Sequence, residues 1–574
     1  MERWRLRLGH PRAPLWILGL TLLLTSTALG MGLQLDDFVL KALLTGKPGV
    51  GVAPWDAFAF FPEGSPRLPV QRELGELPWW TAPDLRLAFF RPLSSLSHWL
   101  DFQLWPDSPV LMHVHNLAWF ALLVFLAGWI YRGVLPEPWV AGLAMLLFAV
   151  DDVHGQAAGW ISSRNTLLSA CFGFLAIALH DRWRRGWRPG VVLAPAAFLA
   201  GLCCGEGATG ALGYLLGHAL FLDPAPGWKR LRGLVPYGFC LVLWRAVYDA
   251  GGFGVEKSGF YLDPLRETAA FLRLLPERFG LLFLTQWGFP PTEFVTASGG
   301  ERSARVLALA GFLLFLLLAW RMGPLLRRDT RARFWATGSL LSMIPIAGTI
   351  PSTRLLLFTG LGGMGLLAQW LASVPRRRID RAVAAVLVII HLVLAPLLLP
   401  VMTYALAIPG QASLHAVSSL PPDSEIQGRD VVIVNSPDFL FFVGYDAPLR
   451  YLEDRPRPAH LRALATGLVP LTVSRPDART LRIDSEVGFP AGLADPVYRG
   501  PTAPLRPGES IALPGMTVEI RAVGEDGRAR SADFRFATPF ESLVWLRWDG
   551  GVYRPFQPPG VGETITLPPA RLPF

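Results

Sequence analysis

Residues 382–405 read AVAAVLVIIHLVLAPLLLPVMTYA, an apolar run long enough to cross a lipid bilayer as one helix. Similar apolar segments recur through the first 405 residues of the chain, at 14–33, 110–131, 138–151, 161–179, 190–204, 208–222, 233–249, 304–320, 335–351 and 355–372. A backbone inside lipid must satisfy its own hydrogen bonds, so each segment is expected to be helical. The sequence therefore predicts a polytopic α-helical membrane domain over residues 1–405, with about 11 transmembrane helices.

The composition of the chain agrees with this prediction. Of its 574 residues, 52% are hydrophobic and only 17% are charged, which is too apolar for a soluble multidomain enzyme. The 21 Trp and 35 Phe residues exclude a disordered chain, because disorder needs few aromatic side chains. All four cysteines lie in apolar stretches, so we expect no structural disulfide and no zinc site.

Basic residues gather in short segments between the apolar runs. The clusters are Arg3/Arg5/Arg7/Arg12, Arg182/Arg184/Arg185/Arg188, Lys229/Arg230/Arg232, Arg327/Arg328/Arg331/Arg333 and Arg376/Arg377/Arg378/Arg381. All fall on the side of the N-terminus, so the positive-inside rule predicts a cytoplasmic N-terminus and, with an odd number of spans, an extracytoplasmic C-terminus. The net charge of +9 is then a topology signal, and we expect membrane lipids but no nucleic acid as partners.

We therefore expect an integral protein of the bacterial inner membrane. The first span also has the basic start and apolar centre of a signal peptide, which is the alternative interpretation. Ser26-Thr27-Ala28 is a poor cleavage site, however, and cleavage would remove the span that positions Asp36 and Asp37.

Two long segments interrupt the spans and are expected to lie on the outer side, at 34–109 and 250–303. The first contains an aromatic stretch from Leu77-Pro78-Trp79-Trp80 to Trp105, and the second an apolar stretch, 271–286, broken by charges. Both patterns are typical of helices that lie in the membrane interface.

The residue pattern of the sequence changes after Tyr404. Short β-type runs, separated by turn signals such as Glu525-Asp526-Gly527, occur at 431–434, 440–443, 516–520, 543–548 and 564–567. Residues 406–574 are therefore predicted to form a β-rich extracytoplasmic domain.

Ionisable and polar residues collect at the outer ends of the predicted spans, where charge near hydrocarbon is costly and often functional. They are Asp36, Asp37, His113, Asn116, Asp151, Asp152, His154, Arg164, Glu206 and Arg354. Any one of them could be a helix cap or a side chain that extends to lipid headgroups. Together, however, they supply the residue types needed to bind an anionic lipid headgroup and to remove a proton.

Several of these residues lie in motifs. Asp36-Asp37 resembles the acidic pair in the first outer loop of GT-C-fold glycosyltransferases that use polyprenyl-phosphate sugars. Four further segments resemble, in order, motifs of the transmembrane O-mannosyltransferases with tetratricopeptide repeats: Phe90-Arg91-Pro92-Leu93 with His113-x-x-Asn116, Val153-His154-Gly155-Gln156-Ala157 with Ser163-Arg164-Asn165, Gly205-Glu206-Gly207, and Arg354-Leu355-Leu356.

The chain also departs from that family's pattern. It has Asp151, Gln156, Thr166 and Gly205 where the family has His, Glu, Asp and Lys, and no repeat period of about 34 residues follows Tyr404. The mannose donor and the acceptors of that family are therefore not carried over.

The resemblance implies an inverting glycosyltransferase that moves a sugar from a polyprenyl-phosphate donor to a protein or glycan acceptor at the outer face. Asp36 or Asp37 is then the candidate base; Arg91, His154, Arg164 and Arg354 are candidates to bind the donor phosphate. His113, Asn116, Asp151, Asp152 and Glu206 would support them. Paired aspartates with histidine also suit Mg²⁺ or Mn²⁺, so a divalent cation stays open.

Two other classes of function remain as alternatives. A transporter or lipid flippase would place charges near span centres and would show repeat-related broken helices, and neither is evident. A non-catalytic envelope assembly protein, whose outer domain binds a partner, would explain the family residues that are absent.

Overall fold

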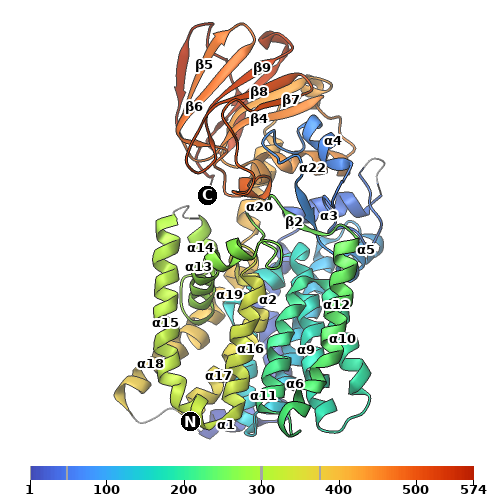
Figure 1. The fold of residues 1–574 in the computed structure, drawn as a ribbon, viewed down its shortest axis with the longest axis vertical. Coiled ribbons are helices and arrows are strands. Elements are labelled where there is room, and N and C mark those ends of the chain that lie inside the picture. The colour runs from blue at the N-terminus through green and yellow to red at the C-terminus, as the bar shows by residue number, and fades with distance from the viewer. Residues whose placement is uncertain (1, 47–49, 298–300, 374–376, 574) are drawn as a thin grey trace.

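The computed structural model describes residues 2–46, 50–297, 301–373 and 377–573 (Figure 1). A bundle of long helices carries the N-terminus at one end and a β-rich domain at the other. Arg376, assigned to the last basic cluster, lies outside the described residues.

All of the predicted spans are helical. The bundle contains α2 (Ala13–Thr25), α6 (Pro109–Val134), α7 (Pro138–Ala149), α9 (Arg164–Arg184), α10 (Gly190–Cys204), α11 (Ala211–Phe221), α12 (Val235–Ala250), α15 (Glu301–Arg328), α16 (Thr330–Ile346), α17 (Leu357–Ala372), α18 (Arg378–Ile389) and α19 (Ala395–Tyr404). Within the described residues, five helical segments are long and apolar enough to cross a membrane: Ala13–Gly30, Pro109–Val134, Ile161–Arg184, Arg302–Arg328 and Arg378–Ser418. Helices α7, α10 and α17 are apolar but shorter.

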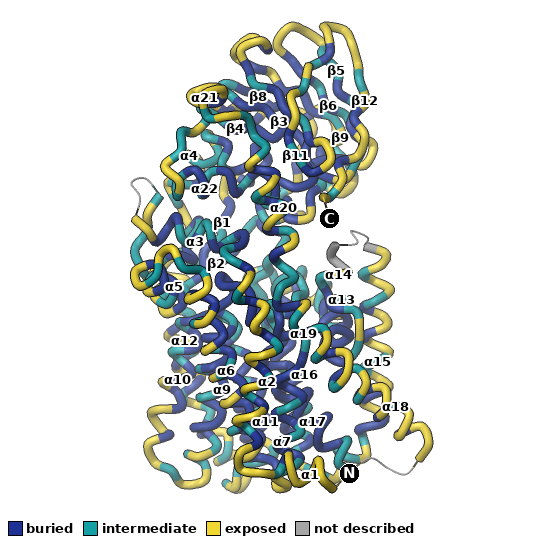
Figure 2. Tube along the Cα trace, turned by 180° about the vertical axis from the view of Figure 1, so that it is seen from behind, coloured by how far each residue is buried: buried dark blue, intermediate teal, exposed yellow. Residues whose placement is uncertain are grey.

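The outward surface of the bundle is apolar. Figure 2 shows exposed residues along the outer side of α15, and there Leu309, Leu313 and Trp320 are 59%, 58% and 64% exposed. Large exposed apolar side chains along one helix are unfavourable in water but suit contact with lipid chains. The bundle is therefore that of an integral membrane protein.

The basic loops meet at the end of the bundle that carries α1 (Glu2–Gly9). Arg132 donates to the His10 carbonyl, and Arg185 donates to the Gly133 carbonyl at 2.9 Å. Arg184 pairs with Asp223 in the next loop at this end. The β-rich domain lies at the opposite end (Figure 1).

The first outer segment folds between the bundle and the β-rich domain. It contains α3 (Asp36–Leu44), α4 (Arg67–Leu74), β1 (Arg86–Ala88) and α5 (Pro92–Leu104), and β1 pairs antiparallel with β2 (Gly254–Glu256). The structure corrects the expected membrane-interface role of Trp79 and Trp80: both are buried, and they pack on Phe534 and Phe439 of the β-rich domain. Their large apolar surface is buried against protein.

The second outer segment contains α13 (Thr268–Trp287) and α14 (Thr292–Ala297). The apolar stretch in α13 was expected to lie in the membrane interface, but α13 packs lengthwise on α15. Gly280 and Gly311 allow this close approach, because a Cβ on Gly280 would overlap the Ala308 carbonyl. Arg278, one of the charges that break the apolar stretch 271–286, is buried and donates to the Ala347 carbonyl.

The C-terminal residues form two sheets, with α20 (Ala407–Ser418), α21 (Asp423–Ile426) and α22 (Asp446–Leu452) beside them. One sheet has the order β11-β10-β3-β4, from Val552–Pro555, Val544–Asp549, Asp430–Ser436 and His460–Thr466. The other is antiparallel with the order β12-β5-β6-β9-β8-β7, from Thr564–Leu567, Leu471–Asp477, Thr480–Phe489, Ala529–Phe536, Met516–Val523 and Ser510–Leu513. The β-rich domain is thus confirmed.

One of its five predicted strands is wrong. Residues 440–443 form a helical turn, because the Asp438 side chain accepts a hydrogen bond from the Phe441 backbone N–H at 3.0 Å and so caps the turn.

Candidate functional site

A cavity of about 670 Å³ lies where the bundle meets the outer segments. Aromatic and apolar side chains form most of its wall, including Phe89, Trp160, Trp244, Tyr261 and Phe358. Its charged lining residues are Asp36, Arg91, Glu206, Arg245, Asp263 and Arg354. Concave, mostly apolar sites with a few converging charges are typical of binding sites for amphipathic ligands.

The two adjacent aspartates at the start of α3 face different surroundings. Asp36 lines the cavity and is half-buried, and its Oδ1 accepts a hydrogen bond from Tyr445 Oη at 2.7 Å. Asp37 is fully buried and accepts from the backbone N–H groups of Gln34 and Ser162, both at 2.8 Å, and from the Ser162 hydroxyl. Consecutive helical residues point about 100° apart, so only one of them reaches the cavity.

Both carboxyl groups are shifted toward the neutral form. Burial raises the pKa of Asp37 to about 7, although its hydrogen bonds from Ser162 and Gln34 act in the opposite direction. Burial also raises the pKa of Asp36, and the Tyr445 hydroxyl and the Arg354 charge oppose that rise. A carboxyl group whose pKa lies nearer neutrality is a better proton acceptor than an ordinary surface aspartate.

Arg354 approaches the cavity from a 3₁₀ turn, Thr353–Leu355. Its guanidinium lies over the Trp160 ring, 5.0 Å from the ring centroid. Within the part of the chain that the structure describes, it forms no ion pair with a carboxylate. Since its charge is held by an aromatic face and not by a fixed anion, the guanidinium can still bind an anionic ligand.

The other charged lining residues are paired. Arg91 donates from Nε and Nη2 to Glu206 Oε2 at 2.9 and 2.8 Å and lies over the Phe89 ring. Arg245 donates to Asp263 at 2.9 Å. Arg91 therefore reaches the cavity as part of an ion pair with Glu206, and the supporting role of Glu206 stays a prediction.

Arg164 lies away from the cavity wall. It is fully buried and pairs with Asp101 at 2.6 Å, and it donates to the Met112 carbonyl at 3.1 Å and to Asn116 Oδ1 at 3.3 Å. Asp101 also contacts His115 at 2.6 Å. Complete burial with several fixed acceptors gives Arg164 a structural environment, unlike Arg354.

The other sequence candidates also contact neighbouring segments and not the cavity. His154 donates to the Phe148 carbonyl at 3.0 Å, His113 donates to the Gly32 carbonyl at 3.0 Å, and Asn116 donates to the Ala158 carbonyl at 2.7 Å. Asp151 accepts from Gln286 at 2.8 Å. Asp152, whose pKa is raised by burial to about 6, follows Asp151 in the same turn. The structure thus brings together Asp36, Arg91, Glu206 and Arg354, and places the others in the surrounding protein.

The aspartate pair does not fit a divalent cation. Both Asp37 oxygens already accept hydrogen bonds, and the described residues contain no group of three His, Cys, Asp or Glu side chains that could hold a metal. We assign no step to Mg²⁺ or Mn²⁺.

Four residues in or near the candidate site were not predicted from the sequence: Tyr445, Arg245, Asp263 and Asp101. Tyr445 lies in the β-rich domain, so no local pattern could connect it with Asp36. The sequence did contain a signal for Asp101, because it is a carboxylate between Trp99 and Trp105 at the end of the aromatic stretch.

The fold and the cavity define the class of the chain: a polytopic helical membrane protein with a β-rich domain above a charged, mostly apolar cavity. No known protein family and no curated protein matches the sequence.

Among solved structures, the chain is similar to the oligosaccharyltransferase AglB from Archaeoglobus fulgidus in complex with an inhibitory peptide and a dolichol-phosphate. The identity is 10% and the TM-score 0.39, and the match covers 79% of this chain and 65% of that chain. It is also similar to ArnT from Cupriavidus metallidurans bound to undecaprenyl phosphate, with 12% identity, a TM-score of 0.38 and coverage of 78% and 89%. The chain thus spans less than two thirds of the length of the archaeal oligosaccharyltransferase.

Proposed function

We propose that the chain is an integral membrane glycosyltransferase that transfers a sugar from a polyprenyl-phosphate donor to an acceptor at the outer face of the membrane. The observation that carries the proposal is that Asp36 and Arg354 line the same cavity. Asp36 supplies a carboxylate for the acceptor proton, and Arg354 supplies, for the phosphate, a guanidinium that forms no ion pair with any described carboxylate. The apolar wall, which includes Leu40 and Trp244, suits the start of a polyprenyl chain.

In the proposed reaction, the acceptor hydroxyl oxygen forms a bond to the anomeric carbon while the bond from that carbon to the phosphate oxygen breaks. Asp36 takes the hydroxyl proton, and the polyprenyl phosphate leaves with the electron pair of the broken bond. The Arg354 guanidinium stabilises the charge that develops on the phosphate, and its planar fork can bind two oxygens.

The surroundings of the carboxylates favour a single, inverting displacement. The cavity is lined by Asp36, Glu206 and Asp263, and the last two are held in ion pairs with Arg91 and Arg245. Asp36 is therefore the one lining carboxylate, among the described residues, that is bonded to a neutral donor instead. A single base supports direct attack by the acceptor, which inverts the anomeric configuration.

Two parts of the chain have different roles in this proposal. Residues 1–405, with the outer segments 34–109 and 250–303, form the membrane domain and cavity; residues 406–574 form an extracytoplasmic domain above them. Charges that gather beside one end of the bundle favour surface chemistry over transport, because a conduction path would place them near span centres. We also infer a location in the inner membrane, because the basic loops lie at one end of the bundle, as the positive-inside rule requires.

Lipid binding tests the proposal directly. Purified protein in nanodiscs is titrated with undecaprenyl phosphate and, in parallel, with undecaprenol, which lacks the phosphate. We expect the phosphate form to bind more tightly and Arg354→Ala to remove that preference. Arg354→Lys should retain part of it, because Lys keeps the charge but not the fork; the loss for a charge-assisted contact is about 1–3 kcal/mol.

Arg554→Ala is the matched control, since Arg554 is an exposed arginine of the β-rich domain. Equal affinity for the two lipids, or an unchanged preference in Arg354→Ala, would reject the phosphate site. Release of undecaprenyl phosphate from a panel of undecaprenyl-phosphate sugars, dependent on Asp36, then establishes transfer.

A further inference from the structure

The β-rich domain contributes a side chain to the cavity region. Tyr445 is only 2% exposed, and its ring packs with Leu35, Trp160 and Leu449 where the domain meets the membrane bundle. Its hydroxyl donates to Asp36 Oδ1 across 409 positions of sequence. Among the described residues, no other side chain hydrogen-bonds the Asp36 carboxylate.

We propose that Tyr445 is a positioning residue for the transfer reaction: it fixes one oxygen of Asp36 and leaves the other directed at the cavity, so that the β-rich domain completes the site. This inference rests on the proposed function, because it assigns Asp36 as the base. Tyr445 does not line the cavity and acts through Asp36 alone.

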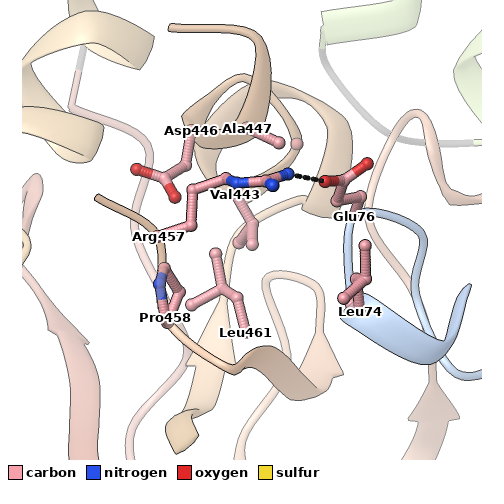
Figure 3. A pocket seen from close by; sticks show the side chains of 10 residues that line it. Leu74, Glu76, Val443, Asp446, Ala447, Arg457, Pro458 and Leu461 are labelled. Atoms are coloured by element: carbon pink, nitrogen blue, oxygen red, sulfur yellow. Dashed lines mark hydrogen bonds and ion pairs between the residues drawn. The ribbon is translucent and has the colours of Figure 1, made fainter. Parts of the chain in front are cut away.

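The helix that follows Tyr445 is anchored independently of this hydroxyl. Arg450 of α22 donates to Asp446 at 2.8 Å and to Asp423 at 2.7 Å, within the β-rich domain. Figure 3 shows a second anchor, the ion pair of Arg457 with Glu76 at 3.2 Å, across a small pocket of about 290 Å³ between the domain and the first outer segment. Since other contacts hold the domain in place, the Tyr445 hydroxyl is available to control the Asp36 carboxylate.

The surroundings of the Tyr445–Asp36 pair keep the Tyr445 hydroxyl protonated, so that it stays a hydrogen-bond donor. Burial and the neighbouring Asp36 hold the pKa of Tyr445 well above its usual value, so the hydroxyl keeps its proton. Arg354 faces Asp36 from the bundle, Asp37 follows Asp36 on α3, and Tyr498 and Asp438 face the pair from the β-rich domain. None of these groups replaces the hydroxyl, because the Asp36 carboxylate is hydrogen-bonded by Tyr445 alone among the described side chains.

The test compares Tyr445→Phe with Tyr451→Phe. Both changes remove one hydroxyl from the same region, but Tyr451 contacts Glu76 and Arg457, not Asp36. The pH profile of sugar release from undecaprenyl-phosphate sugar is measured at saturating donor. A donor to the charged carboxylate favours ionisation, so its loss should move the acidic limb up by about one pH unit in Tyr445→Phe. Tyr451→Phe should keep the wild-type limb, and a limb that does not move in Tyr445→Phe overturns the proposal.

A measurement without turnover separates this inference from the proposed function. The protonated carboxyl band of Asp36, assigned by its loss in Asp36→Asn, is followed by infrared titration. Its midpoint should rise in Tyr445→Phe, and an unmoved midpoint overturns the pairing. If Tyr445→Phe does not fold, 3-fluorotyrosine at position 445 keeps the hydroxyl and makes it a stronger donor, so the midpoint should fall; an unchanged midpoint again overturns the pairing. A wild-type chain that releases no lipid phosphate rejects the proposed function, while the titration still decides the pairing.

Discussion

Asp36 and Asp37 are adjacent in sequence, but their different environments predict different roles. Asp36 faces the cavity, and Asp37 joins the segment before α3 to the turn that contains Ser162. Asp36→Asn should abolish sugar release while the protein still folds, since the amide cannot take the acceptor proton. In the wild type, release should fall as the pH drops through the raised pKa of Asp36, because the base must be ionised.

Asp37→Asn should instead lower stability. Its Oδ2 accepts from Gln34 and its Oδ1 from Ser162, so an amide with one acceptor oxygen leaves a buried N–H without a partner. We expect a cost of about 1–3 kcal/mol in thermal unfolding. Full release in Asp36→Asn, or equal stability of Asp37→Asn and the wild type, would contradict this division.

The sequence does not distinguish Arg164 from Arg354, since each lies in a motif at the outer end of a predicted span. Arg164 is fully buried against Asp101, so Arg164→Ala leaves Asp101 Oδ2 buried without its cation, with only His115 still on the other oxygen, and should destabilise the fold by about 3–5 kcal/mol. The double change Arg164→Met with Asp101→Leu should recover much of that loss. Chemical unfolding in detergent measures both. If the Arg164→Ala protein is stable but has lost lipid-phosphate binding, Arg164 is a phosphate ligand and not a structural residue.

At the scale of elements, all of the spans could be predicted from the sequence, but only part of the candidate site. A long apolar run has one way to satisfy its backbone in lipid, so 382–405 and the other runs all became helices. Short runs carry less information: Leu440 to Val443 has a strand-like composition, but the Asp438 cap makes it helical. The sequence indicated Asp36 and Arg354 from their motifs, whereas Tyr445 and Asp263 reach the cavity region only through tertiary packing.

One tight packing of elements supports the cavity wall. Helix α8 (Gly155–Gly159) lies against α19, and a Cβ at Gly159 would overlap the carbonyl oxygen of Thr403. Gly159→Ala should therefore displace α8 and the adjoining Trp160 wall, at a cost of about 1–3 kcal/mol. Gly238→Ala on α12 is the control, because nothing lies within 4 Å of a Cβ there. Thermal unfolding should separate the two; equal stability would show that α8 can move without cost.

At the scale of the whole molecule, the positions of the basic loops and of the β-rich domain indicate the same orientation in the membrane. The basic loops meet near α1 at one end of the bundle, and the β-rich domain with the cavity beneath it lies at the other. A membrane protein places its Lys- and Arg-rich short loops in the cytoplasm. In that orientation, Asp36, Arg354 and Tyr445 would all lie on the side of the membrane away from cytoplasmic sugar nucleotides, which suits the proposed donor carried across on lipid.

This orientation predicts the behaviour of reporter fusions. A reporter that is active only in the cytoplasm should be silent when fused after Phe574, and one that is active only outside the cytoplasm should work there. The same cytoplasmic reporter inserted after Arg188, in the basic loop between α9 and α10, should be active, because that loop lies at the end that carries α1. Replacing Arg184, Arg185 and Arg188 with Gln should weaken this preference, since the loop charge contributes to orientation. Cytoplasmic activity at Phe574 together with silence at Arg188 would invert the topology, and would place the cavity where a donor translocated on lipid could not reach it.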